Sequence, residues 1–197
     1  MRIYRHRIAD DLLKRKLLGK GAVLIQGPKW CGKTTTAKQV AKSLLDLGDT
    51  AELSNALETV QILPKKLLEG ENPRLIDEWQ TLPELWDMVR SEVDRRGEMG
   101  QFILTGSSVP VDEEKRRHSG TGRFGWIKMR PMSLWESGDS TGKISLSDLF
   151  SGQVFEPFEC SMELEQLAFL VCRGGWPGAT FLEGDIALDQ ARDYYEA

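Results

Sequence analysis

The chain has 197 residues, of which 40% are hydrophobic and 28% are charged, and this composition excludes a largely disordered protein. Its length fits about one domain, or one domain with a small appendage. The three cysteines show no metal-ligand spacing, and the longest apolar runs fall far short of the ~20 residues that cross a bilayer. We therefore expect a protein of a reducing cytoplasm, without a zinc finger, a disulfide framework or a membrane span.

The net charge of −4 is unevenly distributed along the chain. Residues 1–48 carry 11 basic and 3 acidic side chains, residues 49–130 carry 12 and 15, and residues 131–197 carry 3 and 12. The positive first segment suits an anionic ligand, either a nucleotide or a nucleic acid. The acidic last segment argues against a nucleic-acid groove along the whole length, and a solvated surface is its simpler interpretation.

In the first third of the chain, the pattern alternates between helices and apolar runs. Ile8 to Leu18 predicts a short helix that ends at Gly19, and Ala22 to Gln26 predicts a buried strand. Further along, we predict a helix from Thr34 to Leu47, a second strand from Thr50 to Leu53, and a helix from Leu57 to Leu68 that Pro64 interrupts.

Three more strands follow in the middle of the chain. Arg74 to Glu78 predicts a strand that ends in two acids, and Gln101 to Thr105 predicts another strand. Phe124 to Met129 alternates loosely, as a half-buried strand does. A helix is predicted between the first two, from Pro83 to Arg96. Strands separated by helices indicate right-handed βαβ units and a parallel sheet.

After Pro131 the pattern becomes helical. We predict four helices, over Met132 to Glu136, Ser147 to Phe150, Glu163 to Cys172 and Asp185 to Ala197. The sequence therefore predicts an α/β core over residues 1–131 and a helical part over residues 132–197.

Residues 27–34, Gly-Pro-Lys-Trp-Cys-Gly-Lys-Thr, fit the phosphate-binding pattern G-x-x-x-x-G-K-[ST] and lie between a strand and a helix. In such a loop, backbone N–H groups surround the β-phosphate, and the helix directs the positive end of its dipole at the same phosphates. Lys33 would neutralise phosphate charge, and the Thr34 hydroxyl would coordinate Mg²⁺. The predicted nucleotide-binding residues are Gly27, Pro28, Lys29, Trp30, Cys31, Gly32, Lys33, Thr34 and Thr35.

Two residues inside this loop leave alternatives open. Lys33 and the helix dipole would lower the pKa of the Cys31 thiol and make it reactive, unless Cys31 is simply a small residue that fits the loop. We expect Trp30 to be half exposed at the loop tip and to pack on a neighbouring element rather than on a nucleotide base.

Two acids, Asp77 and Glu78, end the strand that begins at Arg74. Ligands of a doubly wound sheet bind at the carboxyl edge of its strands. Asp77 would hold Mg²⁺ and Glu78 would accept a proton from the attacking water, so this pair favours hydrolysis over kinase chemistry. The alternative is a surface acid pair that ends a strand.

The strand that ends at Thr105 delivers hydroxyl residues to the same edge. We predict that Ser107 senses the γ-phosphate and orients the water, with Thr105 and Ser108 as rival candidates. An ordinary Gly-Ser-Ser turn would explain the same residues.

A basic, glycine-bearing segment runs from Lys115 to Arg123. Arg123 is interpreted either as an arginine finger, acting in cis or from a neighbouring subunit, or as a structural residue. Lys115, Arg116 and Arg117 either contact a nucleic-acid backbone or form a solvated charge run.

The motifs gain specificity when they are taken as an ordered set: residues 27–34, Leu75 to Gln80, Leu104 to Ser108, Gly122-Arg123 and Arg130 to Glu136. Together they resemble the AAA-type ATPases of bacteria and archaea, which are related to the archaeal ATPase and STAND branch of the additional-strand P-loop proteins. The resemblance covers almost the whole chain. It implies a three-layer α/β core with a parallel sheet of the P-loop NTPase type, followed by a partial helical lid.

The resemblance also implies roles for matching residues. Lys33 and Thr34 fall on the phosphate and Mg²⁺ positions, Asp77 and Glu78 on the acidic pair, Ser107 on the sensing position, and Arg123 on an arginine before the last core strand. Pro177 lies in a Gly-x-Pro element similar to that of the related lid, where the proline is near the adenine. Alternatively, Pro177 only ends a helical pattern.

Proteins of this group are usually much longer, and the last predicted helix reaches Ala197 without a stop signal. We therefore expect a shortened product that lacks a C-terminal partner domain.

The leading functional hypothesis is an ATPase that uses ATP and Mg²⁺ to move a lid or a C-terminal partner domain. The alternatives are a nucleotide-gated binding switch with negligible turnover, an ATPase module of a DNA-processing system, and a small-molecule kinase. A homo-oligomer is expected if Arg123 acts in trans.

Overall fold

The computed structural model describes residues 4–107, 120–156 and 162–196. The chain divides into two compact units, of which one comprises residues 6–130. The other comprises residues 131–197 together with the first five residues of the chain. Each unit has its own packing and is described separately below.

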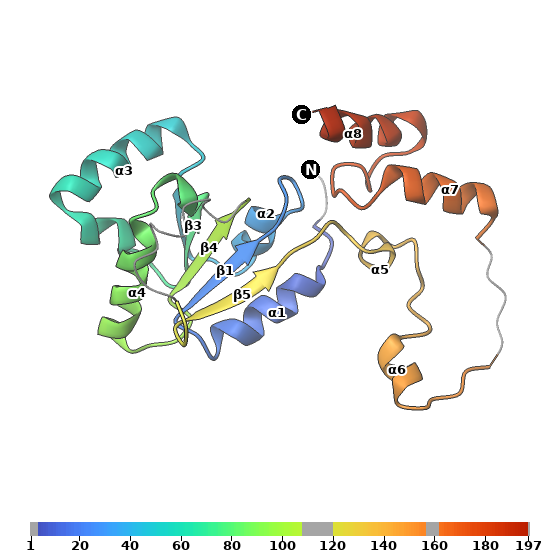
Figure 1. Cartoon of the computed structure of the whole chain (residues 1–197), viewed down its shortest axis with the longest axis horizontal. Coiled ribbons are helices and arrows are strands. Elements are labelled where there is room, and N and C mark those ends of the chain that lie inside the picture. The colour runs from blue at the N-terminus through green and yellow to red at the C-terminus, as the bar shows by residue number, and fades with distance from the viewer. Residues whose placement is uncertain (1–3, 108–119, 157–161, 197) are drawn as a thin grey trace. The chain divides into compact units, whose positions relative to one another are not determined.

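The first unit is built on a parallel sheet. Its five described strands are β1 (Ala22–Gln26), β2 (Ser43–Asp46), β3 (Arg74–Asp77), β4 (Phe102–Gly106) and β5 (Phe124–Lys128). They lie in the order β2-β3-β4-β1-β5, and every pair is parallel (Figure 1). Strand β4 is therefore inserted between β1 and β3, which is the additional-strand arrangement that the resemblance implies.

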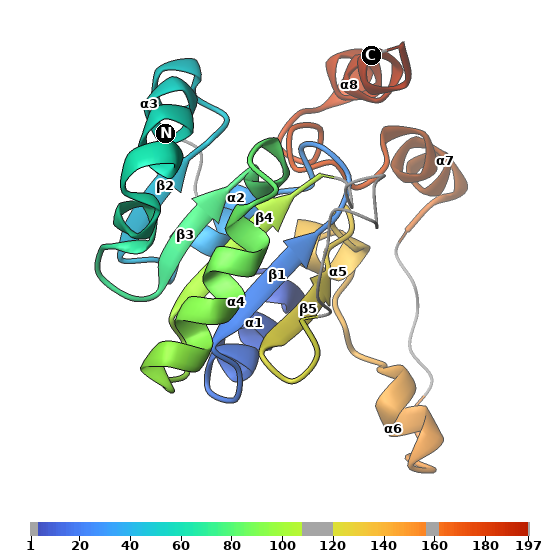
Figure 2. The same ribbon diagram turned by 60° about the vertical axis from the view of Figure 1, so that its left-hand side comes forward.

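Helices cover both faces of this sheet, so the core has three layers. Helix α4 (Leu85–Arg96) covers one face, and α1 (Ile8–Leu17) and α2 (Lys33–Lys38) cover the other (Figure 2). Because both faces are covered, the central strands are apolar throughout rather than alternating. On the α4 side, Leu24, Ile76 and Leu104 are fully buried against Trp86 and Val89 of the helix.

One part of the predicted element order is wrong. The helix predicted over residues 34–47 ends at Lys38, the second strand is Ser43–Asp46, and residues 50–53 begin helix α3 (Thr50–Ile62) instead of forming a strand. Asp49 explains the start of α3, because its carboxylate accepts hydrogen bonds from the N–H groups of residues 51 and 52, both at 2.9 Å. Strand β2 forms because its backbone pairs with β3, a distant contact that local periodicity does not reveal.

The interruption at Pro64 follows the sequence prediction. Helix α3 ends before Pro64, where a 3₁₀ helix, η1 (Pro64–Leu68), begins, because proline cannot continue an α-helix. A second 3₁₀ turn, η2 (Trp79–Thr81), follows β3 and leads towards α4.

The second unit is helical in its described residues, as predicted. It contains α5 (Leu134–Ser137), α6 (Leu146–Phe150), α7 (Leu164–Arg173) and α8 (Gly184–Glu196). Arg173 is buried and donates to the Asp139 carboxylate at 2.7 Å, while the rings of Trp176 and Tyr194 lie 3.9 Å apart between centroids. Across the described ranges of both units, none of the helices has the length and apolar character needed to cross a membrane.

Candidate nucleotide-binding site

The carboxyl edge of the sheet brings most of the predicted site residues together. The 27–34 loop follows β1, Asp77 ends β3, and Ser107 follows β4. In the ladder, Gln26 lies opposite Gly106 and Asp77 lies opposite Thr105, so the three strands end at the same level. The loop, the acidic pair and the sensing position therefore share one edge, which is where ligands of parallel sheets bind.

Glycines shape the two ends of the loop. A Cβ added at Gly27 would lie 2.2 Å from the Met129 carbonyl oxygen, so only glycine fits there. Gly32 has a φ of 102° and starts helix α2, so its N–H and those that follow point out of the helix end. This geometry is suited to a phosphate group.

Between these glycines, the loop residues differ in exposure. Trp30 has a φ of 62° and is 70% exposed, which is more than the half exposure expected. Lys29 is exposed, Pro28 is half-buried, and Thr35 is exposed on the first turn of α2. The Lys33 ammonium is buried and donates to the carbonyl oxygen of Pro28 at 2.9 Å, so the loop itself holds this cation in the present structure.

Asp77 is the centre of the polar contacts at this edge. Its Oδ1 accepts hydrogen bonds from the Thr34 hydroxyl at 2.9 Å and from the Thr105 hydroxyl. Asp77 and Thr105 are both buried, so the hydroxyl of Thr105 is engaged with Asp77 rather than directed at a ligand. A hydroxyl and a carboxylate oxygen side by side are ligands that Mg²⁺ prefers, so Thr34 and Asp77 fit this ion.

The other two predicted catalytic residues of this edge lie next to Asp77. Glu78 follows it directly with a φ of 52°, and its carboxylate accepts a hydrogen bond from the Gln80 side chain. Ser107 is half-buried in the turn after β4. Ser108 lies outside the described residues, as do Lys115, Arg116 and Arg117.

The environment of Cys31 favours the simpler of its two interpretations. The side chain is fully buried, and this burial raises the pKa of the Cys31 thiol despite the nearby charges of Lys33 and Arg7. A raised pKa keeps the thiol protonated and unreactive. Cys31 is therefore better explained as a small residue that fits the loop than as a reactive thiol, the other interpretation that the sequence leaves open.

Arg7 is a contact residue that the sequence analysis missed. Its guanidinium is buried and donates to the carbonyl oxygens of Cys31 at 2.8 Å and of Arg130 at 2.9 Å. It thereby ties the nucleotide loop to the chain just after β5. The sequence offered only a weak signal, the basic cluster at residues 5–7, because both acceptors are backbone atoms far away in the chain.

Arg123 is not brought to this edge. It precedes β5, and its carbonyl oxygen accepts from the N–H of Ala22, the first residue of β1, so it lies at the amino edge of the sheet. Its guanidinium donates to the Asp94 carboxylate at 2.8 Å, and this hydrogen bond lowers the pKa of Asp94 and raises that of Arg123. The placement does not support an arginine finger in cis, and the trans role stays a prediction.

Pro177 and Arg173 belong to the second unit. Pro177 is half-buried, and its carbonyl oxygen accepts from the Thr180 hydroxyl at 3.2 Å. Its proposed contact with the adenine stays a prediction. The Arg173 side chain is engaged with Asp139, which makes it a structural residue of this unit.

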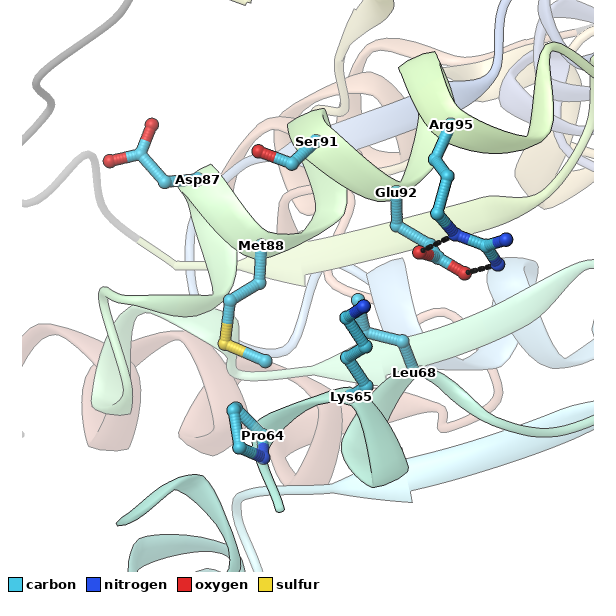
Figure 3. Close-up of a pocket in the computed structure, with 8 residues that line it drawn as sticks. All are labelled: Pro64, Lys65, Leu68, Asp87, Met88, Ser91, Glu92 and Arg95. Carbon is cyan, nitrogen blue, oxygen red and sulfur yellow. Dashed lines mark hydrogen bonds and ion pairs between the residues drawn. The ribbon is translucent and has the colours of Figure 1, made fainter. Parts of the chain in front are cut away.

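A pocket of about 420 Å³ lies away from the carboxyl edge, between η1 and α4 (Figure 3). On its wall, Glu92 accepts hydrogen bonds from Arg95 at 2.7 and 2.8 Å and from Arg96 at 2.6 Å. Mainly because of the bonds from Arg95, the pKa of Glu92 falls to about 2. The pocket includes none of the predicted site residues; its lining comprises Pro64, Lys65, Leu68, Asp87, Met88, Ser91, Glu92 and Arg95.

Comparison with known proteins relates the chain to a protein family. A family model described as "AAA domain" matches residues 19–137, which include the loop, the acidic pair and all the described strands. The chain belongs to this AAA-domain family. It is therefore a P-loop ATPase by class, for which nucleotide binding and hydrolysis are the general activities.

Two curated relatives of the AAA-domain chain are uncharacterized proteins, one of Mycobacterium bovis and one of Mycobacterium tuberculosis. Each is 29% identical over 140 residues, which cover 70% of this chain and 31% of the relative. Among solved structures, a Walker-type ATPase of Pyrococcus abyssi matches 96% of this chain and 68% of its own, with a TM-score of 0.55 and 16% identity. At this identity, the likeness establishes the shared α/β fold.

Proposed function

We propose that the chain binds ATP together with Mg²⁺ and hydrolyses it at the carboxyl edge of the sheet. The observation that carries this proposal is the convergence on Asp77, whose Oδ1 accepts from Thr34 of the helix after the loop and from Thr105 of the neighbouring strand. This places a buried carboxylate directly beside the first turn of α2. A phosphate-binding loop with an adjacent carboxylate is the arrangement that a metal-bound nucleoside triphosphate needs.

Each residue at this edge has a separate role in binding or hydrolysis. Lys33 transfers its hydrogen bond from the Pro28 carbonyl to the phosphates, and the backbone N–H groups around Gly32 bind the same anion. Thr34 and Asp77 would hold Mg²⁺, which when bound neutralises phosphate charge. Glu78 accepts a proton from the attacking water, and Ser107 orients that water near the γ-phosphate.

We also propose that hydrolysis changes the position of the second unit or of a partner domain. The division into two compact units supports this idea, because the chain passes between them only at residues 5–6 and 130–131 within the described ranges. In this proposal, residues 132–197 act as a lid, and Pro177 approaches the adenine when nucleotide is bound.

Two variants test the hydrolysis proposal, each with a matched control. Lys33→Ala should abolish ATP binding measured by calorimetry, whereas Lys38→Ala, an exposed lysine of the same helix, should bind as the unaltered chain does. Glu78→Gln should keep binding and lose turnover by about a hundredfold or more, whereas Glu84→Gln should keep both.

Retained binding in Lys33→Ala would overturn the assignment of the loop, and retained turnover in Glu78→Gln would overturn the assignment of the base. Tight ATP binding without turnover in the unaltered chain would contradict hydrolysis and favour a nucleotide-gated switch.

A further inference from the structure

The backbone of Glu78 is held in an uncommon conformation. Its φ of 52° is in the left-handed region, which costs a non-glycine residue free energy and persists only where the surroundings fix it. Here the η2 turn fixes it, because the N–H and the hydroxyl of Thr81 both donate to the Glu78 carbonyl oxygen, at 3.0 and 2.8 Å. The turn therefore fixes the direction in which the Glu78 side chain leaves the backbone.

The end of the Glu78 side chain is held by a different residue. The Nε2 atom of Gln80 donates to the Glu78 carboxylate, across only two residues of sequence. Gln80 is half-buried, and its nitrogen end is thereby committed to Glu78. Removing this donor would free the carboxylate to rotate about its side-chain torsions.

The oxygen end of Gln80 is directed at the neighbouring strand. A Cβ built on Gly106 would lie 2.5 Å from Gln80 Oε1, so this oxygen occupies the space beside the last residue of β4 that any larger side chain would need. The same oxygen is buried and has no hydrogen-bond donor among the residues that the structure describes. Ser107, the residue that we propose to sense the γ-phosphate, follows Gly106 directly.

We propose that Gln80 is a positioning residue for hydrolysis, linking the Gly106–Ser107 turn to the carboxylate of Glu78. This inference rests on the proposed function of Glu78. A carboxamide donates at one end and accepts at the other, so one side chain connects both elements. Because its oxygen end fills the space beside Gly106, a shift of the turn on γ-phosphate binding moves the carboxamide and redirects the carboxylate.

Substitution of Gln80 by methionine separates this role from simple packing, because methionine keeps the size of the side chain and removes both polar ends. We expect Gln80→Met to lower kcat for ATP by about tenfold or more, as small misplacements of a catalytic group do, while KM changes less than about twofold. Gln80→Glu keeps the size and acceptor capacity but lacks the donor, and we expect it to lose at least as much. Gln61→Met, the same change on the exposed face of α3, is the control and should leave kcat unchanged.

A double-mutant cycle completes the test. In a Glu78→Gln background, Gln80→Met should cause no further loss of turnover, because Gln80 acts through Glu78. Unchanged kcat in both Gln80 variants, with turnover lost in Glu78→Gln, would overturn the role of Gln80 and leave the proposed function intact. Full turnover in Glu78→Gln, or none in the unaltered chain, would overturn both.

Discussion

The two edges of the parallel sheet differ in what the chain places there. At the carboxyl edge, the loop after β1 holds Lys33 through the Pro28 carbonyl, and Thr34 donates to Asp77 at the end of β3, in partly buried hydrogen bonds. At the amino edge, Arg123 precedes β5 and forms an exposed ion pair with Asp94. The direction of the strands therefore decides which residues can reach a ligand. A residue that directly follows a strand lies at the carboxyl edge, where ligands bind, whereas one that directly precedes a strand lies at the opposite edge, whatever its charge.

The largest effect on folding should come from Arg7, at the carboxyl edge. Arg7→Ala leaves the carbonyl oxygens of Cys31 and Arg130 without their donor, which should lower the free energy of unfolding by about 2–3 kcal/mol. Because one acceptor belongs to the loop, the affinity for ATP should fall as well. Urea unfolding and calorimetry measure both quantities, and an unchanged ATP affinity in a folded Arg7→Ala variant would contradict the link.

A smaller effect, confined to stability, is expected from Glu92 in the last part of α4. Glu92→Gln should lower the free energy of unfolding at pH 7 by about 1–2 kcal/mol, less than the full change in pKa implies, because water reaches its partner Arg95. The pKa of Glu92 is lowered from 4.5 to about 2 by folding, so its contribution is present above pH 4.5 and is lost as the pH falls towards 2.

Urea unfolding of both proteins between pH 7 and pH 3 measures this prediction, with ATP affinity at pH 7 as the second readout. The difference in the free energy of unfolding between Glu92→Gln and the unaltered chain should become smaller below pH 4.5. The ATP affinity of the two proteins at pH 7 should be the same. A difference in unfolding free energy that does not change with pH would contradict the role of the ion pairs of Glu92 with Arg95 and Arg96.

The smallest effect is expected from Arg123, at the amino edge. Arg123→Ala removes an exposed ion pair, so the urea midpoint and the ATP affinity should hardly change. Turnover of ATP measured over a range of protein concentrations distinguishes a role of Arg123 in trans from a role in cis. If Arg123 acts in trans, the variant loses the part of the turnover that rises with concentration; a loss at every concentration would show that it acts in cis, against the geometry described above.

Much of the core could be predicted from the sequence, because its signals are local. Strands β1 and β4 are apolar runs, β3 has an apolar pair before its terminal acid, and β5 alternates as a half-buried strand does. The phosphate-binding pattern marks the turn after β1. Once the strands are known to be parallel, the shared edge of Lys33, Asp77 and Ser107 follows.

The remaining features depend on partners that are distant in the chain. The short segment Leu44 to Leu47, with three leucines and one aspartate, fits a helix or a strand equally well, and the pairing with β3 makes it a strand. Likewise, the pairing of Arg123 with Asp94 and the contacts of Arg7 join residues that no local pattern connects. The Gln80–Glu78 bond is local, but it requires a turn whose geometry no sequence pattern indicates.

The central claim is that the carboxyl edge binds the metal-bound nucleotide. A crystal structure of the chain with Mg²⁺ and a non-hydrolysable ATP analogue tests it most directly. We predict that the phosphates lie in the 27–34 loop, that Lys33 has moved from the Pro28 carbonyl to the phosphates, and that the metal lies beside Thr34 and Asp77. A nucleotide bound elsewhere, or a Lys33 still bonded to Pro28 with the site filled, would contradict the claim.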